Sequence, residues 1–374
     1  MSADPAPSSW QKYLIAAFAA AATLASPGAV PAQGYAGMAQ TAAGFALPDP
    51  DRRFGFPADH GPHYDFRLEW WYLTANLTGP DGAPYGVQWT LFRSALAPGG
   101  EREGWLSPEI WMGHAAVTTP GRHEAAQKFA RGGIGQAGVT AEPFEAWIDQ
   151  WRLAAPGDDN DDDNDDGDGL DRLRLTASTA DFAYDLALTA TGPIVPQGRN
   201  GYSVKSPEGQ ASHYYSQPFY RIDGTLTLED TTVPVAGQGW LDREWSSQPL
   251  SETQQGWDWV SLHFESGAKL MAYRLRDAKA APFTPATWIA ADGTPTPLPD
   301  GAVTMTPGAT TRIGHAEIPT EWDIALPEKG LEIHLRALNP RAWNDLDFAY
   351  WEGPVRVTGS HPGVGYLEMT GYGE

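Results

Sequence analysis

Apolar and polar side chains alternate along residues 69–93, near the start of the chain. In the first half of this stretch one row is apolar, and the other carries rings and polar groups, namely Trp70, Tyr72, Thr74 and Asn76. Side chains of a β-strand point to its two faces in turn, so the alternation predicts a strand. A turn containing Pro and Gly follows and the alternation resumes at Val87, so the whole stretch predicts a β-hairpin.

Two interpretations of the mixed row stay open. Trp70 and Tyr72 are unusual on a fully solvated face, so the row is expected to line a ligand cavity inside a barrel. The alternative is that both rows pack in a core or against another sheet. Gln88, on the returning strand, belongs to the same candidate ligand-binding set.

A weaker copy of this pattern covers residues 258–276. An acid and Trp259 open a strand, a turn follows at Gly267, and the returning strand ends at Leu275 and Arg276. Two related hairpins predict two β units in tandem. The chain also has 41 Gly, 32 Pro and 16 Trp, and stretches with helical periodicity are scarce, so the expected fold class is all-β.

Length and charge narrow the classes of function. With 374 residues the chain exceeds the usual size of one core, so two domains are expected. The net charge is -22, with 25 Lys and Arg against 47 Asp and Glu, which argues against nucleic acid as a partner. Cysteine is absent, which agrees with export without proving it.

The N-terminus predicts export to the periplasm or the extracellular space. Lys12 precedes an apolar run at residues 13–24, which has the length of a signal-peptide core and is too short to span a bilayer. Small residues at positions 30–32 suit a signal peptidase. We therefore expect a signal peptide at residues 1–32, a flexible leader at 33–53, and no stable membrane insertion after cleavage.

An acidic insertion occupies residues 158–171 between two expected strands of one hairpin. Asp162, Asn164 and Asp166 with Gly167 resemble the start of a calcium loop, but Leu173 stands where an EF-hand needs its bidentate acid. A complete EF-hand is excluded, and we expect a solvated loop.

Candidate acids lie in residues 236–245. If this segment is extended, Asp242 and Glu244 share a face with Trp240, while Arg243 points to the other face. Two carboxylates near each other in a buried place can keep a proton at neutral pH, so they are candidate general acids. The alternative is a salt-bridge network centred on Arg243.

A polar and aromatic segment at residues 197–220 is the second candidate region. Hydroxyls, rings and one imidazole suit the wall of a pocket, although Tyr also packs well in strands. The candidates here and in the second hairpin are Tyr202, His213, Tyr214, Tyr215, Trp257, Trp259 and His263.

Four motifs together resemble the AttH-like, carotenoid 1,2-hydratase-related family of lipocalin-like proteins, often labelled predicted secreted hydrolases. They are residues 69–73 (EWWYL), 214–218 (YYSQP), 240–245 (WLDREW) and 365–368 (GYLE). The resemblance covers about residues 54–372. It implies two tandem lipocalin-like antiparallel β-barrels, which we place at residues 54–235 and 236–374.

The resemblance is less decisive for activity. Members hydrate the terminal double bond of acyclic carotenoids, and others are encoded beside ABC-type exporters without an established reaction. No catalytic residue is carried over from the family. The protein is therefore expected to bind an apolar isoprenoid or lipid-like molecule and to hydrate or isomerise it by carboxylate acid catalysis. The alternative is a non-catalytic carrier of a hydrophobic ligand that works with an ABC-type exporter.

The hypothetical mechanism assigns roles to the candidate residues and needs no cofactor. Asp242 or Glu244 would protonate an alkene carbon, His213 or His263 would orient the water, and rings would stabilise the cation. The rings are those of Trp240, Trp257, Trp259 and Tyr215.

Hydrolysis has little support in the sequence. There is no G-x-S-x-G elbow and no Cys nucleophile. His60 and His63 could supply two loop ligands, but no third ligand is placed, so no metal site is expected.

Overall fold

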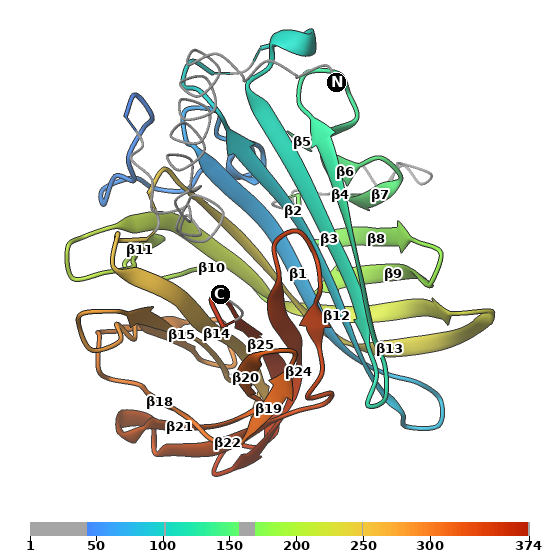
Figure 1. Ribbon diagram of the computed structural model, residues 1–374, viewed down its shortest axis with the longest axis vertical. Helices are drawn as coiled ribbons and strands as arrows, with labels where there is room; N and C mark the ends of the chain where they lie inside the picture. Colours follow the sequence, from blue (N-terminus) through green and yellow to red (C-terminus); the bar gives the residue numbers. More distant parts are fainter. Residues whose placement is uncertain (1–42, 101, 157–168, 249, 373–374) are drawn as a thin grey trace, which may run out of the picture. The chain divides into compact units, whose positions relative to one another are not determined.

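The computed structural model describes residues 43–100, 102–156, 169–248 and 250–372, and these residues form a nearly all-β protein (Figure 1). The predicted signal peptide and residues 157–168 of the acidic insertion lie outside the described residues. Residues 43–53, in the expected leader, form no helix or strand. The short 3-10 helices η2 (Ala58–His60), η3 (Gly104–Leu106) and η4 (Pro327–Lys329) complete the regular structure of the described part.

The first sheet curls into a nearly closed barrel. Its main path runs β4-β3-β2-β1-β13-β12-β9-β8-β7-β6-β5, and β10 and β11 pair with β12. The strands are β1 (Leu68–Thr78), β2 (Pro84–Ala95), β3 (Glu109–Thr118), β4 (His123–Arg131), β5 (Ala137–Ala141), β6 (Phe144–Ile148), β7 (Trp151–Ala154), β8 (Arg172–Ser178), β9 (Phe182–Ala190), β10 (Val195–Pro196), β11 (Tyr202–Val204), β12 (Ala211–Leu228) and β13 (Thr231–Ser246).

The second sheet forms a half-barrel with the path β17-β16-β15-β14-β25-β24-β22-β21-β18, and β23 pairs with β24. The strands are β14 (Gln254–Phe264), β15 (Lys269–Asp277), β16 (Ala286–Ile289), β17 (Pro295–Leu298), β18 (Thr304–Pro307), β21 (Glu321–Leu326), β22 (Leu331–Ala337), β23 (Trp343–Asn344), β24 (Tyr350–Gly359) and β25 (Gly363–Met369). A separate small ribbon pairs β19 (Thr310–Ile313) with β20 (Ala316–Pro319).

Both predicted hairpins are confirmed. β1 pairs with β2 in the antiparallel sense, with Trp70 opposite Phe92, and β14 pairs with β15, with Trp259 opposite Tyr273. β7 and β8, which flank the acidic insertion, also pair as expected, with Leu153 opposite Leu175. The fold class predicted from the alternation is therefore confirmed.

The change of sheet along the chain falls after Ser246. β13 pairs with β1 and β12 of the first sheet, whereas the expected domain boundary at residues 235 and 236 lies within this strand. The two sheets belong to one compact unit. The division into two domains stays a prediction.

Each sheet has a packed core on one face. Trp71, Leu73 and Leu77 of β1, from the apolar row, belong to the first core, and Trp322, Trp351 and Leu367 belong to the second. A third apolar cluster contains residues of both sheets, including Tyr72 and Trp240 from the first and Trp259 and Tyr273 from the second. The mixed row of β1 faces the second sheet, so its expected location inside a barrel is wrong, although Trp70 and Tyr72 do line a pocket.

Candidate functional site

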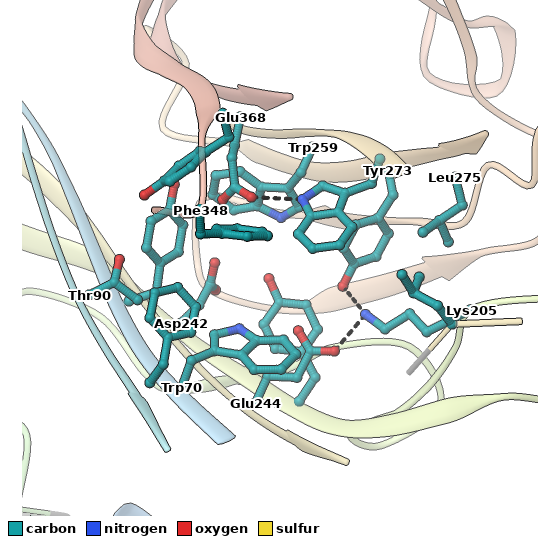
Figure 2. A pocket seen from close by; sticks show the side chains of 16 residues that line it. Trp70, Thr90, Lys205, Asp242, Glu244, Trp259, Tyr273, Leu275, Phe348 and Glu368 are labelled. Carbon is teal, nitrogen blue, oxygen red and sulfur yellow. Dashed lines mark hydrogen bonds and ion pairs between the residues drawn. The ribbon is translucent and has the colours of Figure 1, made fainter. Parts of the chain in front are cut away.

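A pocket lies between the two sheets and takes its walls from both (Figure 2). About 770 Å³ of space, part of it open to solvent, lies among its walls. The lining residues are Trp70, Tyr72, Thr90, Phe92, Lys205, Tyr214, Asp242, Glu244, Leu250, Trp257, Trp259, Tyr273, Leu275, Phe348, Tyr350 and Glu368.

Strand register explains how the first sheet presents its acids to this pocket. Asp242 and Glu244 alternate along β13, and their neighbours on β1 are Tyr72 and Trp70. On the other side, Ser216 of β12 stands opposite Asp242. Cross-strand neighbours share a face of the sheet, so the predicted common face of the two acids is confirmed.

Asp242 is buried and has no cationic partner among the described ion pairs. Its Oδ1 accepts hydrogen bonds from Ser216 Oγ at 2.5 Å and from Trp240 Nε1 at 2.6 Å. Burial disfavours the charged form and raises the pKa of Asp242 to about 7, although these hydrogen bonds lower it. Asp242 can therefore hold and release a proton near neutral pH.

Glu244 has a different environment. Its Oε1 lies 2.7 Å from Lys205 Nζ and also accepts a hydrogen bond from Ser212 Oγ. Lys205 Nζ in turn lies 2.5 Å from the Tyr273 hydroxyl. Glu244 is thus held by a buried cation, and the two predicted acids differ in chemistry.

Two further carboxyls lie on the second sheet. Glu352 of β24 stands directly opposite Glu368 of β25. Tyr72 Oη donates to Glu352, and Trp257 Nε1 donates to Glu368 Oε1 at 2.7 Å. Burial and the neighbouring acid raise the pKa of Glu352 well above its usual range, and burial raises the pKa of Glu368 to about 7. Glu368 therefore places a second protonatable carboxyl on the wall opposite Asp242.

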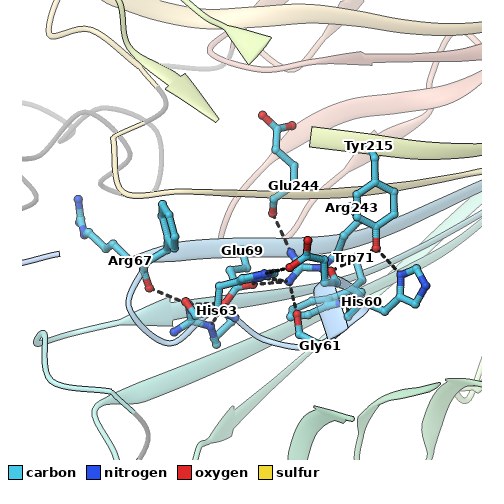
Figure 3. A network of polar contacts seen from close by, with 12 residues as sticks. His60, Gly61, His63, Arg67, Glu69, Trp71, Tyr215, Arg243 and Glu244 are labelled. Carbon is cyan, nitrogen blue, oxygen red and sulfur yellow. Dashed lines mark hydrogen bonds and ion pairs between the residues drawn. The ribbon is translucent and has the colours of Figure 1, made fainter. Parts of the chain in front are cut away.

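Arg243 lies on the other face of β13, in a polar network separate from the pocket (Figure 3). Its guanidinium donates to Glu69 Oε2, and Arg93 Nε donates to Glu69 Oε1 at 2.6 Å. Arg93 Nη1 also lies 2.6 Å from Glu109 Oε2. The alternative salt-bridge network centred on Arg243 therefore exists, but it uses Glu69 rather than Asp242 or Glu244.

His63 and His60 are also held by protein partners. His63 stacks on Trp245 with ring centroids 3.9 Å apart and contacts Glu69 and Asp59. His60 Nδ1 lies 2.6 Å from the Tyr215 hydroxyl. Among the residues that the structure describes, no His, Asp and Glu side chains form a group of three or more that could hold a metal ion. Within the same ranges, no helix has the length and apolar character needed to cross a bilayer.

The structure brings part of the predicted site together. The predicted residues that line the pocket are Trp70, Tyr72, Tyr214, Asp242, Glu244, Trp257 and Trp259. Trp240 is fully buried outside the pocket lining and donates a hydrogen bond to Asp242.

The other predicted site residues lie elsewhere. His213 lies on the opposite face of β12 from Tyr214, beside Trp245 and Phe66, and its Nε2 accepts a hydrogen bond from the Asp49 amide at 3.2 Å. Tyr215 packs in the first core, and His263 borders a second groove between the sheets. Gln88 and Tyr202 are not among the pocket-lining residues. These side chains lie outside the pocket lining, and their roles stay predictions.

The lining residues with polar chemistry that the sequence did not single out include Lys205, Tyr273, Tyr350 and Glu368. Each belongs to a segment recognised as polar or strand-like. Their chemical type gave a signal, but their convergence depends on the stacking of the two sheets, which no local periodicity encodes.

Comparison with known proteins agrees with this fold. The model of the AttH-like family matches residues 47–372. The crystal structure of a putative AttH from Nitrosomonas europaea has 32% sequence identity and a TM-score of 0.76, covering 88% of this chain and 100% of that chain. No curated protein matches the sequence.

Two more distant structures share the fold. Kievitone hydratase from Nectria haematococca is 16% identical with a TM-score of 0.63, over 88% of this chain and 98% of that chain. CghA, solved with Sch210972, is 12% identical with a TM-score of 0.53, over 88% of this chain and 97% of that chain. With the family match over nearly the whole described chain and the 32% identical structure, the chain belongs to the AttH-like family.

Proposed function

We propose that this protein binds an apolar molecule between its two sheets and protonates a carbon–carbon double bond of that molecule, so that it acts as a hydratase or an isomerase. One observation carries the proposal. Asp242 is a buried carboxyl with a pKa of about 7 and no cationic partner among the described ion pairs, and it faces a pocket lined mainly by rings and aliphatic groups.

The reaction begins with proton transfer from the Asp242 carboxyl to one alkene carbon. The carbon–carbon π electrons form the new C–H bond, and the other alkene carbon becomes cationic. Electron-rich ring faces such as those of Trp70 and Trp259 stabilise a cation. A general acid whose pKa lies near the working pH is effective because it is both protonated and able to give up its proton.

The cation then has two fates. Addition of water and loss of one proton gives an alcohol, so that hydration adds one H and one OH overall. Loss of a proton from a neighbouring carbon gives an isomer with a shifted double bond. In either case ionised Asp242, or Glu368 on the opposite wall, takes up the released proton. One of the fold's neighbours is named a hydratase, which is the same class of reaction, although that likeness concerns the fold.

The test starts with the native ligand. Lipids extracted from protein purified from its own host and identified by mass spectrometry supply the substrate, and turnover in deuterated water measures incorporation of deuterium at carbon. We expect Asp242→Asn to reduce incorporation by at least about 100-fold while binding is kept. Asp223→Asn, which changes an exposed acid on β12, is the matched control and should keep full activity.

The carrier hypothesis is the other outcome of this experiment. If the extracted lipid binds and neither protein incorporates deuterium, the protein is a carrier, and an ABC-type exporter is then its proposed partner. We also propose, from residues 1–32 alone, that the protein acts after export. A mature protein whose mass matches a start at Met1 would contradict that proposal.

A further inference from the structure

One end of the pocket is polar. Lys205 lies on the turn between β11 and β12, and its ammonium group sits between Glu244 and the Tyr273 hydroxyl, as Figure 2 shows. The Nζ atom also lies 4.0 Å from the centroid of the Tyr273 ring and 5.0 Å from that of Tyr214. A charged side chain is therefore built into a wall that is otherwise rich in rings.

The position of Lys205 is fixed by its backbone. Its amide donates to Gln210 O at 2.7 Å, and its carbonyl accepts from Gln254 Nε2 at 2.7 Å. Its side chain is only 5% exposed, and burial lowers the pKa of Lys205 although Glu244 raises it. A buried ion pair contributes little net stability compared with apolar side chains of similar volume, so stability alone does not account for it.

Both members of the pair keep hydrogen-bonding capacity. An ammonium group has three N–H donors, and Lys205 uses two of them, on Glu244 and Tyr273. Oε1 of Glu244 accepts hydrogen bonds from both Lys205 Nζ and Ser212 Oγ, and Oε2 has no hydrogen-bond partner within the described part of the chain. One donor of Lys205 and one acceptor of Glu244 therefore stay unused, and both residues line the pocket.

A hydroxyl group fits this arrangement, because it accepts one hydrogen bond and donates another. An anionic group does not fit, since Lys205 is the one cation among the lining residues and Glu244 already pairs with it. We propose that the substrate is a neutral amphipathic molecule with an apolar body and one hydroxyl group, and that this hydroxyl binds between Lys205 and Glu244. The proposal rests on the proposed function and adds the substrate class.

Three matched probes test the proposal: biphenyl, para-hydroxybiphenyl and para-phenylbenzoate, each displacing the neutral apolar dye Nile red from the full-length protein. We expect para-hydroxybiphenyl to bind about tenfold more tightly than biphenyl, because one hydrogen bond to a charged group typically raises affinity by about that factor. The carboxylate should bind more weakly than the phenol.

Variants locate the preference. Lys205→Met should abolish the preference for the phenol over biphenyl. Tyr273→Phe should only reduce it. Lys269→Met is the matched control, because Lys269 is also largely buried and stacks on a ring, that of Phe219, but lies outside the pocket. If Lys205→Met does not fold, the double variant Lys205→Met with Glu244→Gln, which removes both charges of the pair, is used in place of the single variant.

The outcomes separate the two proposals. A preference that is lost with Lys205 and kept in Lys269→Met supports the hydroxyl site. Equal affinity for phenol and biphenyl in the wild type, or a preference that survives both Lys205→Met and Tyr273→Phe, overturns it while the apolar pocket stands. Failure of Nile red to bind overturns the proposed function together with this inference.

Discussion

At the scale of single residues, the same side-chain type behaves differently according to which face of a strand it occupies. Glu69 lies on the core side between two guanidinium groups, and these cations hold its pKa well below the usual range although burial raises it. Asp242 lies on the pocket side without a cation, and burial raises its pKa to about 7. The partner on the same face therefore decides whether a buried acid is a structural anion or a proton donor.

Asp242 should make stability depend on pH. Its folded pKa of about 7 lies above the ordinary 3.8, so between these values the folded state binds more protons than the unfolded state. Stability therefore falls as pH rises through this range, and the full cost is present above about pH 7. Asp242→Asn keeps the acceptor for Ser216 and Trp240 and cannot ionise. We expect this variant to gain stability relative to the wild type as pH rises.

The measurement is the urea unfolding midpoint of both proteins across this pH range. Burial also raises the pKa of Glu368, so the Asp242→Asn variant should retain part of the decrease in stability with rising pH. A stability difference between wild type and variant that does not change with pH would contradict the raised pKa. Asp223→Asn, at an exposed position, should leave the dependence of the urea midpoint on pH unchanged.

At the scale of elements, β1 and β13 carry two functions on opposite faces. Glu69, Trp71 and Leu73 point toward the core side, where Glu69 ties β1 to Arg93 of β2 and Arg243 of β13. Trp70 and Tyr72 point toward the pocket. A strand that alternates in this way connects the polar network to the site.

Loss of the network charge should destabilise the first sheet strongly. Glu69→Gln leaves two buried guanidinium groups without their shared carboxylate, and breaking a buried ion pair costs about 3–5 kcal/mol. Chemical unfolding measures the loss. Glu145→Gln, which removes a partly exposed ion pair with Arg152, is the control and should cost at most about 1 kcal/mol. Equal losses in the two variants would mean that the buried network does not stabilise the sheet.

Sequence patterns predicted these elements well, for a physical reason. Alternation and turn residues are local signals, so both hairpins and the shared face of Asp242 and Glu244 could be predicted from neighbouring positions alone. Which part of the molecule that face packs against is not determined by neighbouring residues in the sequence. Rings at alternate positions of β1 predict a barrel interior, whereas in the structure they cover the sheet face that packs against the second sheet.

At the scale of the whole molecule, close contact between the sheets shapes the pocket. A Cβ at Gly86 of β2 would lie 2.5 Å from the Tyr366 hydroxyl and 2.6 Å from Pro354 Cγ of the second sheet. Glycine therefore lets the two sheets approach at this point. Lys205 comes from the first sheet's region and Tyr273 and Glu368 from the second sheet, so they line one pocket only because the two sheets stack. Their common location could therefore not be predicted from the sequence.

Gly86→Ala should force the sheets apart locally. Overpacking of this kind costs about 1–3 kcal/mol, and displaced walls should weaken binding of Nile red in the pocket. Gly55→Ala is the matched control, because a Cβ at Gly55 meets no atom within 4 Å. Unchanged stability and dye affinity in Gly86→Ala would show that the second sheet can shift without affecting the site.

The separation of cores from pocket has a consequence for how specificity can change. Because the pocket uses the outward side chains of strands whose inward side chains fill the two sheet cores, a substitution at Phe92 alters the binding surface and leaves all three apolar clusters packed. Specificity can therefore change most freely at positions such as Phe92 and Thr90, which line the pocket outside the apolar cluster between the sheets, whereas Leu275 and Tyr273 serve the pocket and that cluster together.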